Sequence, residues 1–237
     1  MSSYDALAKF YDDVNGEPVE RIRQILDATA RFRPQATKVL ELGCGTGAIM
    51  AGHGSNFELT VVDLSTEMIE VARRRCPTAT FVVDDITTFT SEQKFDAVLC
   101  VYDTINHLTS WAQWQALFAN VRELLVDGGL FIFDVNTVGR FQDLGEVDPW
   151  VYDFEEHTLI MELDYSRAPL ATWHIRVFES LGNGTFTLHQ ERIEELAVPL
   201  DNIIKELGSF TKVVVASDTQ GGSATDEAHR ALFVVEK

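Results

Sequence analysis

Residues 39–47 read Val-Leu-Glu-Leu-Gly-Cys-Gly-Thr-Gly, and this stretch constrains the fold more than any other part of the chain. A short apolar run leads into three glycines at alternate positions, and a helical pattern follows. In α/β proteins, a strand that ends in a glycine turn and opens a helix usually holds part of a nucleotide. The stretch therefore predicts an α/β fold with a nucleotide-like ligand at this turn.

The first 136 residues alternate between strand-like and helix-like segments. Apolar runs predict strands at 38–42, 59–63, 80–83, 95–102 and 130–135. Apolar residues at helical spacing predict helices at 17–33, 46–51, 65–75 and 111–125, with Ser65 as a candidate N-cap. Such alternation predicts a parallel sheet with helices on both faces, which is a doubly wound fold.

The pattern changes after Asn136. Alternating residues predict antiparallel strands at 158–165, 172–181 and 185–193, and Asn183-Gly184 is a type I′ hairpin signal between the last two. A helix at 199–207 and strands at 211–216 and 231–236 follow. We therefore expect a core formed by residues 1–136 and 197–237, with an antiparallel β insert at 137–196 acting as a cap.

Composition narrows the class of partner and the compartment. The net charge of −18 disfavours nucleic acid and suits a cationic or neutral small-molecule substrate. No apolar stretch is long enough to span a bilayer, and the N-terminus lacks a secretory pattern. Cys44, Cys76 and Cys100 are far apart, without metal-site or disulfide spacing. We expect a cytoplasmic protein that meets neither membrane nor nucleic acid.

The glycine turn alone does not identify the nucleotide. Gly43, Gly45 and Ala48 loosely fit a dinucleotide fingerprint, and Asp63 stands where its ribose-binding acid is expected.

Three other features favour a different ligand. The carboxylate of Glu41 could neutralise an ammonium group, and Gly47 lets the backbone approach a compact amino-acid tail. After the third strand, one carboxylate of Asp84-Asp85 could accept from an adenine amino group while Ile86 packs on the ring.

Taken with the stretches at 61–65, 84–85, 95–108 and 124–137, the sequence resembles a class I S-adenosylmethionine-dependent methyltransferase. The resemblance covers nearly the whole chain and is closest to a bacterial small-molecule group that includes amino-sugar N-methyltransferases. It implies a Rossmann-like sheet of seven strands with the last antiparallel. It also implies S-adenosyl-L-methionine as the methyl donor and S-adenosyl-L-homocysteine as the product.

The same resemblance implies the residues that hold the cofactor. These are Tyr4, Tyr11, Glu41, Gly43, Cys44, Gly45, Asp63, Leu64, Met68, Asp85, Ile86, Val101 and Tyr102. The glycine loop would line the methionine part, Asp63 would hold the ribose hydroxyls, and Val101 and Tyr102 would lie beside the sulfonium. The two early tyrosines would fold over the cofactor. Relatives often carry an arginine soon after the second tyrosine, but here none occurs before Arg21.

The residues that could act on the acceptor are less well defined. His107 follows the fourth strand, so it either deprotonates the acceptor or caps the next helix, and Tyr11 is a second catalytic candidate. Asp134 and Asn136 either touch an acceptor or simply end the fifth strand. The acids Glu191, Glu194 and Glu195 are interpreted as a solvated face, and no metal site is expected.

The resulting hypothesis is methyl transfer from S-adenosylmethionine to a small molecule, with N-methylation favoured over O-methylation, by a monomer or homodimer. A NAD-dependent oxidoreductase is one alternative, although it would need a Tyr-x-x-x-Lys pair that we do not find. A regulator that binds the cofactor without turnover is the other. The acceptor and the methylated atom stay open at this point.

Overall fold

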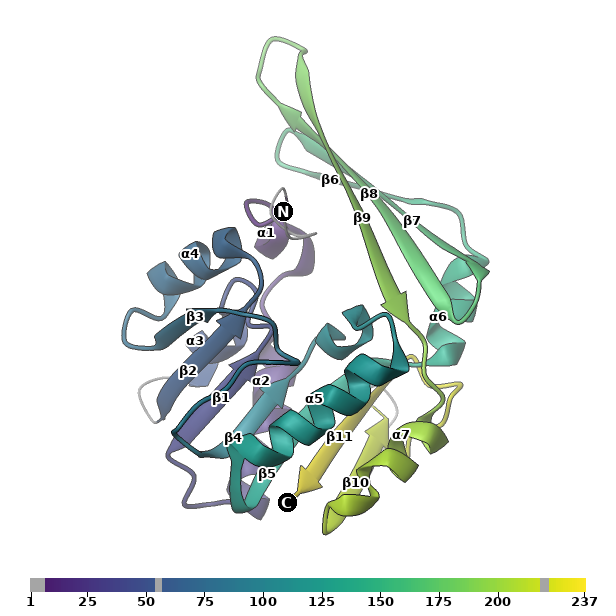
Figure 1. Ribbon diagram of the computed structural model, residues 1–237. Helices are drawn as coiled ribbons and strands as arrows, with labels where there is room; N and C mark the ends of the chain where they lie inside the picture. Colours follow the sequence, from purple (N-terminus) through teal and green to yellow (C-terminus); the bar gives the residue numbers. More distant parts are fainter. Residues whose placement is uncertain (1–6, 54–56, 218–221) are drawn as a thin grey trace.

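The computed structural model describes residues 7–53, 57–217 and 222–237. Its main body is a seven-stranded sheet, and a separate four-stranded sheet stands beyond one edge of that body (Figure 1). The strands of the main sheet are β1 (Lys38–Leu42), β2 (Glu58–Asp63), β3 (Thr80–Val83), β4 (Phe95–Cys100), β5 (Leu125–Asn136), β10 (Lys212–Ser217) and β11 (Arg230–Glu236).

The main sheet has the order β10-β11-β5-β4-β1-β2-β3. The pairs from β3 across to β5 are parallel, whereas β11 runs antiparallel to both β5 and β10. The prediction of a doubly wound, seven-stranded, mainly parallel sheet with an antiparallel last strand is confirmed. This order places the carboxyl ends of β1 and β4 side by side, where ligands bind in open α/β sheets.

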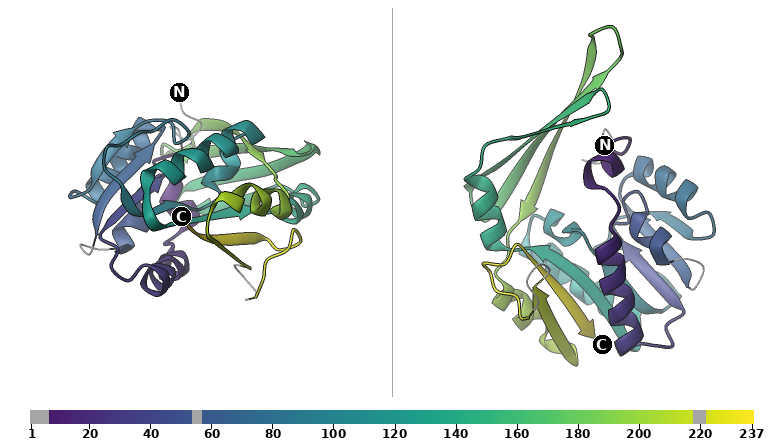
Figure 2. Two further views of the ribbon diagram at one scale, coloured as in Figure 1. Left: turned by 60° about the horizontal axis from the view of Figure 1, so that its bottom comes forward. Right: turned by 180° about the vertical axis from the view of Figure 1, so that it is seen from behind.

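Helices cover both faces of the main sheet because alternate strand residues point to opposite sides. In β5, Phe131 and Phe133 share a core with α5 (Trp111–Leu124) and α7 (Leu200–Glu206). Leu130 and Ile132 face the other way, toward α2 (Val19–Phe32), α3 (Ala48–His53) and α4 (Thr66–Arg75). Figure 2 shows α2 on the face opposite α5. Among the described helices, none is long and apolar enough to cross a membrane.

The insert is a four-stranded antiparallel sheet in the order β6-β7-β8-β9. Its strands are β6 (Trp150–Phe154), β7 (His157–Arg167), β8 (Leu170–Ser180) and β9 (Phe186–Leu196). Asn183 and Gly184 have φ of 53° and 78° in a turn that the Thr185 N–H closes onto the Gly182 carbonyl. The predicted hairpin at Asn183-Gly184 is thus confirmed.

Several elements differ from the prediction. The structure adds α1 (Tyr11–Asn15), α6 (Val138–Gly145), β6 and the short 3₁₀ helices η2 (Thr104–His107) and η3 (Leu207–Ser209). β6 lacks the expected alternation because four of its five residues are exposed on an edge strand. β4 ends at Cys100 and not at residue 102, since Tyr102 has a positive φ that no strand accommodates. β5 begins five residues earlier than predicted and runs through Gly128-Gly129.

Candidate functional site

A pocket of about 310 Å³ lies at the carboxyl ends of β1, β2, β3 and β4, and we call it the central pocket. All the described residues that were predicted to bind the cofactor line it, as does His107. They are Tyr11, Glu41, Gly43, Cys44, Gly45, Asp63, Leu64, Met68, Asp85, Ile86, Val101 and Tyr102. Tyr4 lies outside the described residues. Residues from five separate segments therefore meet at one hollow.

The glycine loop forms one wall of this pocket. Its three glycines, Gly43, Gly45 and Gly47, have φ of 73°, 52° and 77°, in a region that residues with a Cβ atom disfavour. A Cβ on Gly43 would lie 2.2 Å from Cγ2 of Thr104, so the loop and the segment after β4 are in direct contact. Nothing lies within 4 Å of the Cβ position of Gly45, which leaves room for a ligand at the tip.

Asp63 ties the loop to the end of β2. One carboxylate oxygen accepts from the Gly45 N–H at 2.8 Å, and the other accepts from the Ser65 N–H at 2.8 Å. Burial raises the pKa of Asp63, and these backbone donors act against that rise. Ser65 in turn caps α4 by accepting from the Met68 N–H, as its position predicted.

Glu41 is the buried acid of the central pocket. It is 2% exposed, and its Oε2 atom has no hydrogen-bond partner among the described residues. Burial, and next the charge of Asp63, raise its pKa well above the ordinary value. A buried polar atom without a partner is costly. A ligand ammonium group at this place would relieve that cost, so the donor set suits an amino-acid tail.

The other end of the central pocket has a different character. Leu64 is 62% exposed at the pocket, next to Ile86 and Asp85. Asp85 accepts from the Thr87 N–H at 2.8 Å and from the Thr87 hydroxyl at 2.7 Å. Its neighbour Asp84 does not line the pocket. An apolar surface with one carboxylate at its edge suits a flat heterocycle with an exocyclic amine.

The α1 helix bridges the central pocket and the insert. Asp12 accepts from the Thr46 hydroxyl at 2.7 Å and pairs with Arg75 of α4 at 2.7 Å. Just before α1, the Phe10 ring packs against Phe154, with ring centroids 5.9 Å apart. Within α1, burial is the main cause that raises the pKa of the Tyr11 phenol. This phenol therefore keeps its proton at neutral pH.

His107 occupies the inner wall of the central pocket. Burial lowers its pKa, while the charge of Asp103 and a hydrogen bond to the Glu194 backbone raise it in part. The alternative in which it caps the next helix is wrong, because Ser110 and Gln113 form a capping box at the start of α5. A neutral imidazole at this wall can accept a proton.

Glu195 was not predicted as a site residue, and its interpretation as part of a solvated face is wrong. It is 2% exposed and accepts from Trp173 Nε1 at 2.7 Å and from Asn136 Nδ2 at 3.3 Å. The same Asn136 nitrogen donates to Asp103 at 2.6 Å. Burial, then the charge of Asp103, raise the pKa of Glu195 to about 8.

A period-two pattern at the end of β9 is the signal that could have revealed Glu195. Within β9, the buried residues Ile193 and Glu195 alternate with the less buried Arg192 and Glu194. In a strand, such residues share one face. Asp134 and Asn136, at the end of β5, are also buried, with 0% and 5% exposure.

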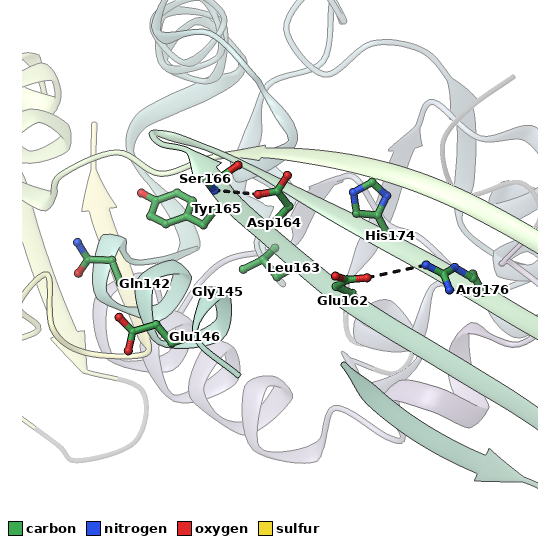
Figure 3. Close-up of a pocket in the computed structure, with 10 residues that line it drawn as sticks. All are labelled: Gln142, Gly145, Glu146, Glu162, Leu163, Asp164, Tyr165, Ser166, His174 and Arg176. Atoms are coloured by element: carbon green, nitrogen blue, oxygen red, sulfur yellow. Dashed lines mark hydrogen bonds and ion pairs between the residues drawn. The ribbon is translucent and has the colours of Figure 1, made fainter. Parts of the chain in front are cut away.

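A second hollow, which we call the edge pocket, lies along β7 beyond the end of β6 (Figure 3). Its volume is about 680 Å³, and its lining includes Glu162, His174 and Arg176 from the insert and Glu146 after α6. None of the predicted site residues lines it. Among the described residues, no group of three acidic, histidine or cysteine side chains could hold a metal ion.

Comparison with known proteins relates this chain to methyltransferases. Residues 39–129 match a family model described as a methyltransferase domain. The chain is 25% identical, over 99% of its length and 100% of the relative's, to a protein of Geobacillus sp. (strain WCH70) that is named as a methyltransferase. It is 29% identical to the dTDP-3-amino-3,6-dideoxy-alpha-D-glucopyranose N,N-dimethyltransferase of Streptomyces fradiae, over 54% of this chain and 52% of that protein.

The fold agrees with this match. The structure superposes on an S-adenosylmethionine-dependent methyltransferase from Clostridium acetobutylicum ATCC 824 with a TM-score of 0.86, at 22% identity and 99% coverage of both chains. The methyltransferase domain at 39–129 contains the glycine loop, Asp63 and the segment after β4, which together build the central pocket. The chain is therefore a class I S-adenosylmethionine-dependent methyltransferase.

Proposed function

We propose that this enzyme methylates the nitrogen of a small-molecule amine, and that amino sugars are the acceptor class to test first. The observation that carries this proposal is the carboxyl pair of Asp103 and Glu195, which Asn136 bridges beside the residues that line the central pocket. At neutral pH Glu195, with a pKa of about 8, is mostly uncharged, and Asp103 pairs with Arg230 at 3.2 Å, so the pair offers an amine hydrogen-bonding oxygens rather than two free negative charges. The N,N-dimethyltransferase of Streptomyces fradiae supports the choice of amino sugars.

We further propose a placement for the cofactor in the central pocket. Glu41 receives the ammonium group, and the loop of Gly43, Cys44 and Gly45 holds the methionine chain. Asp63 binds the ribose hydroxyls. Leu64, Met68, Asp85 and Ile86 enclose the adenine, and Val101 and Tyr102 lie beside the sulfonium. Two observations support this fit, namely the unpartnered Oε2 of Glu41 and the open space over Gly45.

When bound, the cofactor supplies a methyl group on a sulfonium centre, which an acceptor lone pair attacks in line. The chain's own contribution is to orient the acceptor and exclude water, and such positioning is worth roughly 7–11 kcal/mol of barrier. The acceptor amine must also be neutral when it attacks. We propose that its proton passes to His107, because burial keeps the imidazole neutral. Tyr11, which keeps its own proton, orients the acceptor and is not a base.

The insert at 137–196 acts in this proposal as a cap over the acceptor, on a core formed by residues 1–136 and 197–237. Its inner face carries Trp173, which stacks on Trp150 with ring centroids 6.0 Å apart. Trp173 also donates to Glu195, so the aromatic wall and the carboxyl pair belong to one side of the site. This wall would contact the body of the acceptor while the acids hold its amine.

The proposed setting is the cytoplasm, with the enzyme as a monomer or homodimer and without nucleic acid or membrane as a partner. The three cysteines are free and buried, which suits a reducing compartment. Size-exclusion chromatography with light scattering would give the number of subunits.

The test is a product assay. The purified enzyme is incubated with S-adenosylmethionine and a panel of dTDP-amino sugars, with the matching hydroxyl sugars as controls. The proposal expects S-adenosylhomocysteine together with an acceptor heavier by one methyl group, from amino sugars alone. Asp63→Asn should abolish product. If only hydroxyl sugars gain mass, O-methylation replaces the proposal, and cofactor binding without any product favours a regulator.

A further inference from the structure

The backbone just after β4 is held in an unfavourable conformation. Tyr102 and Asp103 have φ of 56° and 52°, in the left-handed region that residues other than glycine disfavour. Among the described residues, Glu155 and Asn183 also have positive φ without being glycine, but only Tyr102 and Asp103 are adjacent. Two such residues in succession persist only where the surroundings enforce them.

Asp134 of β5 is the group that enforces this turn. Its Oδ2 accepts from the Tyr102 N–H at 3.0 Å, and its Oδ1 accepts from the Asp103 N–H at 2.7 Å. Asp134 is fully buried, and two arginines compensate its charge. Arg21 of α2 approaches at 3.1 Å and Arg230 of β11 at 2.9 Å. Each carboxylate oxygen therefore has one backbone donor and one guanidinium.

The turn that Asp134 holds is part of the wall of the central pocket. Tyr102 lines that pocket, and the next residue but one, Thr104, donates to the Val101 carbonyl at 2.8 Å. The Thr104 methyl carbon lies only 2.2 Å from the position that a Cβ on Gly43 would take. The turn thus packs directly on the glycine loop, and a shift of the turn would change the wall beside the proposed sulfonium position.

We infer that Asp134 is a positioning residue for methyl transfer, which fixes the Tyr102–Asp103 turn against the methyl-bearing end of the cofactor. Its action passes through the two backbone N–H groups and not through contact with the acceptor. The inference rests on the proposed placement of the sulfonium beside Tyr102. It does not depend on which acceptor is methylated.

The chain offers a matched control in Asp96. This carboxylate also accepts two backbone N–H groups, from Thr37 at 2.9 Å and from Lys38 at 3.1 Å, and it pairs with Arg33 at 3.0 Å. It lies at the amino-terminal edge of the main sheet, away from the central pocket. Asp96→Asn therefore removes a similar set of bonds without touching the site.

The experiment compares the binding of S-adenosylmethionine and S-adenosylhomocysteine by calorimetry. These ligands differ only in the methyl group and the positive charge it places on sulfur, so their affinity ratio reports on that end of the pocket. Asp134→Asn should weaken the binding of S-adenosylmethionine about five-fold more than the binding of S-adenosylhomocysteine. A change of this size is expected because the energetic coupling transmitted through such contacts is modest. Asp96→Asn should leave the ratio unchanged.

If Asp134→Asn weakens the binding of both ligands equally, Asp134 has a general structural role and the inference is overturned. Failure of the wild type to bind either ligand would overturn it together with the cofactor placement, whereas failure of the acceptor panel alone would leave it standing. If Asp134→Asn does not fold, Arg21→Gln removes one support of Asp134 from outside the pocket. It should change the ratio in the same direction by a smaller factor, and an unchanged ratio would overturn the inference.

Discussion

At the level of single residues, the carboxyl group of Glu195 makes the folding stability of the molecule depend on pH. Asp103, Asn136, Arg230 and Trp173 surround it, and burial is the largest cause of its raised pKa. A carboxyl whose pKa is raised by folding contributes stability below its unfolded pKa, and that contribution is lost as the pH rises through the folded value of about 8.

Glu195→Gln should therefore gain stability relative to the wild type as the pH rises from 5 to 9. The amide cannot ionise, so it avoids the burial of a charge. The difference should reach about 1 kcal/mol or more, which is roughly 2–4 °C in Tm for a chain of this size. Thermal unfolding at both pH values measures it. Glu194→Gln, which changes a partly exposed neighbour, should show the same dependence of Tm on pH as the wild type. If Tm changes with pH equally in Glu195→Gln and in the wild type, Glu195 is not the group with the raised pKa.

The glycine loop gives a second test at this scale. Gly43→Ala combines a positive φ with a Cβ only 2.2 Å from Thr104, whereas Gly45→Ala has a positive φ and open space. Backbone strain costs about 1–2 kcal/mol in each variant, and only Gly43→Ala adds a steric clash. Gly43→Ala should therefore have the lower Tm of the two, as thermal unfolding would show. A lower Tm for Gly45→Ala would mean that the loop is not held by Thr104.

At the level of elements, α1 joins the loop, α4 and the insert through few contacts. The ion pair of Asp12 and Arg75 is partly exposed, with side-chain exposures of 35% and 26%, so its contribution is small. If Tyr11 of α1 folds over the bound cofactor, as the resemblance implies, Arg75→Gln should speed dissociation of S-adenosylhomocysteine by up to about five-fold, which matches an exposed pair of about 0.2–1 kcal/mol. Stopped-flow displacement measures this rate. Arg74→Gln, on the exposed side of the same helix, is the control and should dissociate like the wild type.

The elements that the sequence predicted best are those that carry a clear apolar run or an apolar helix face in the sequence itself. β1 and β3 have the predicted bounds because each is a short apolar run, and α5, which has an apolar face, ends one residue earlier than predicted. α6 and β6 were not predicted. α6 packs against β7, and β6 pairs on one side only, so neither carries a full pattern of its own. Their existence depends on a partner that lies elsewhere in the chain.

At the level of the whole molecule, the net charge of −18 on 237 residues opposes compaction. Salt screens this self-repulsion, and the Debye length falls from about 30 Å at 0.01 M to about 8 Å at 0.15 M. The Tm should therefore rise by a few degrees when sodium chloride is raised over this range. Differential scanning calorimetry would show it. A fall in Tm would mean that ion pairs such as that of Arg33 and Asp96 outweigh the repulsion.

The sequence by itself determined the sheet, the glycine loop and many of the residues that line the central pocket. These residues lie within a few positions of a strand end, so short-range pattern and parallel-strand geometry place them together. Glu41, Gly43, Asp63 and Asp85 could each be named before the structure because each lies within two positions of the end of a strand.

Only the tertiary structure revealed the buried polar groups at the ends of β5 and β9. Asp134 meets Arg21 and Arg230 across separations of 113 and 96 residues, and Glu195 meets Asn136 across 59. No local period encodes such encounters, because they depend on how β5, β9 and β11 pack in space. A buried charge or acid is recognisable only when its partners are known, since burial without them would be unfavourable. The cofactor could thus be inferred from local pattern, whereas the groups that position the reaction emerged from long-range packing.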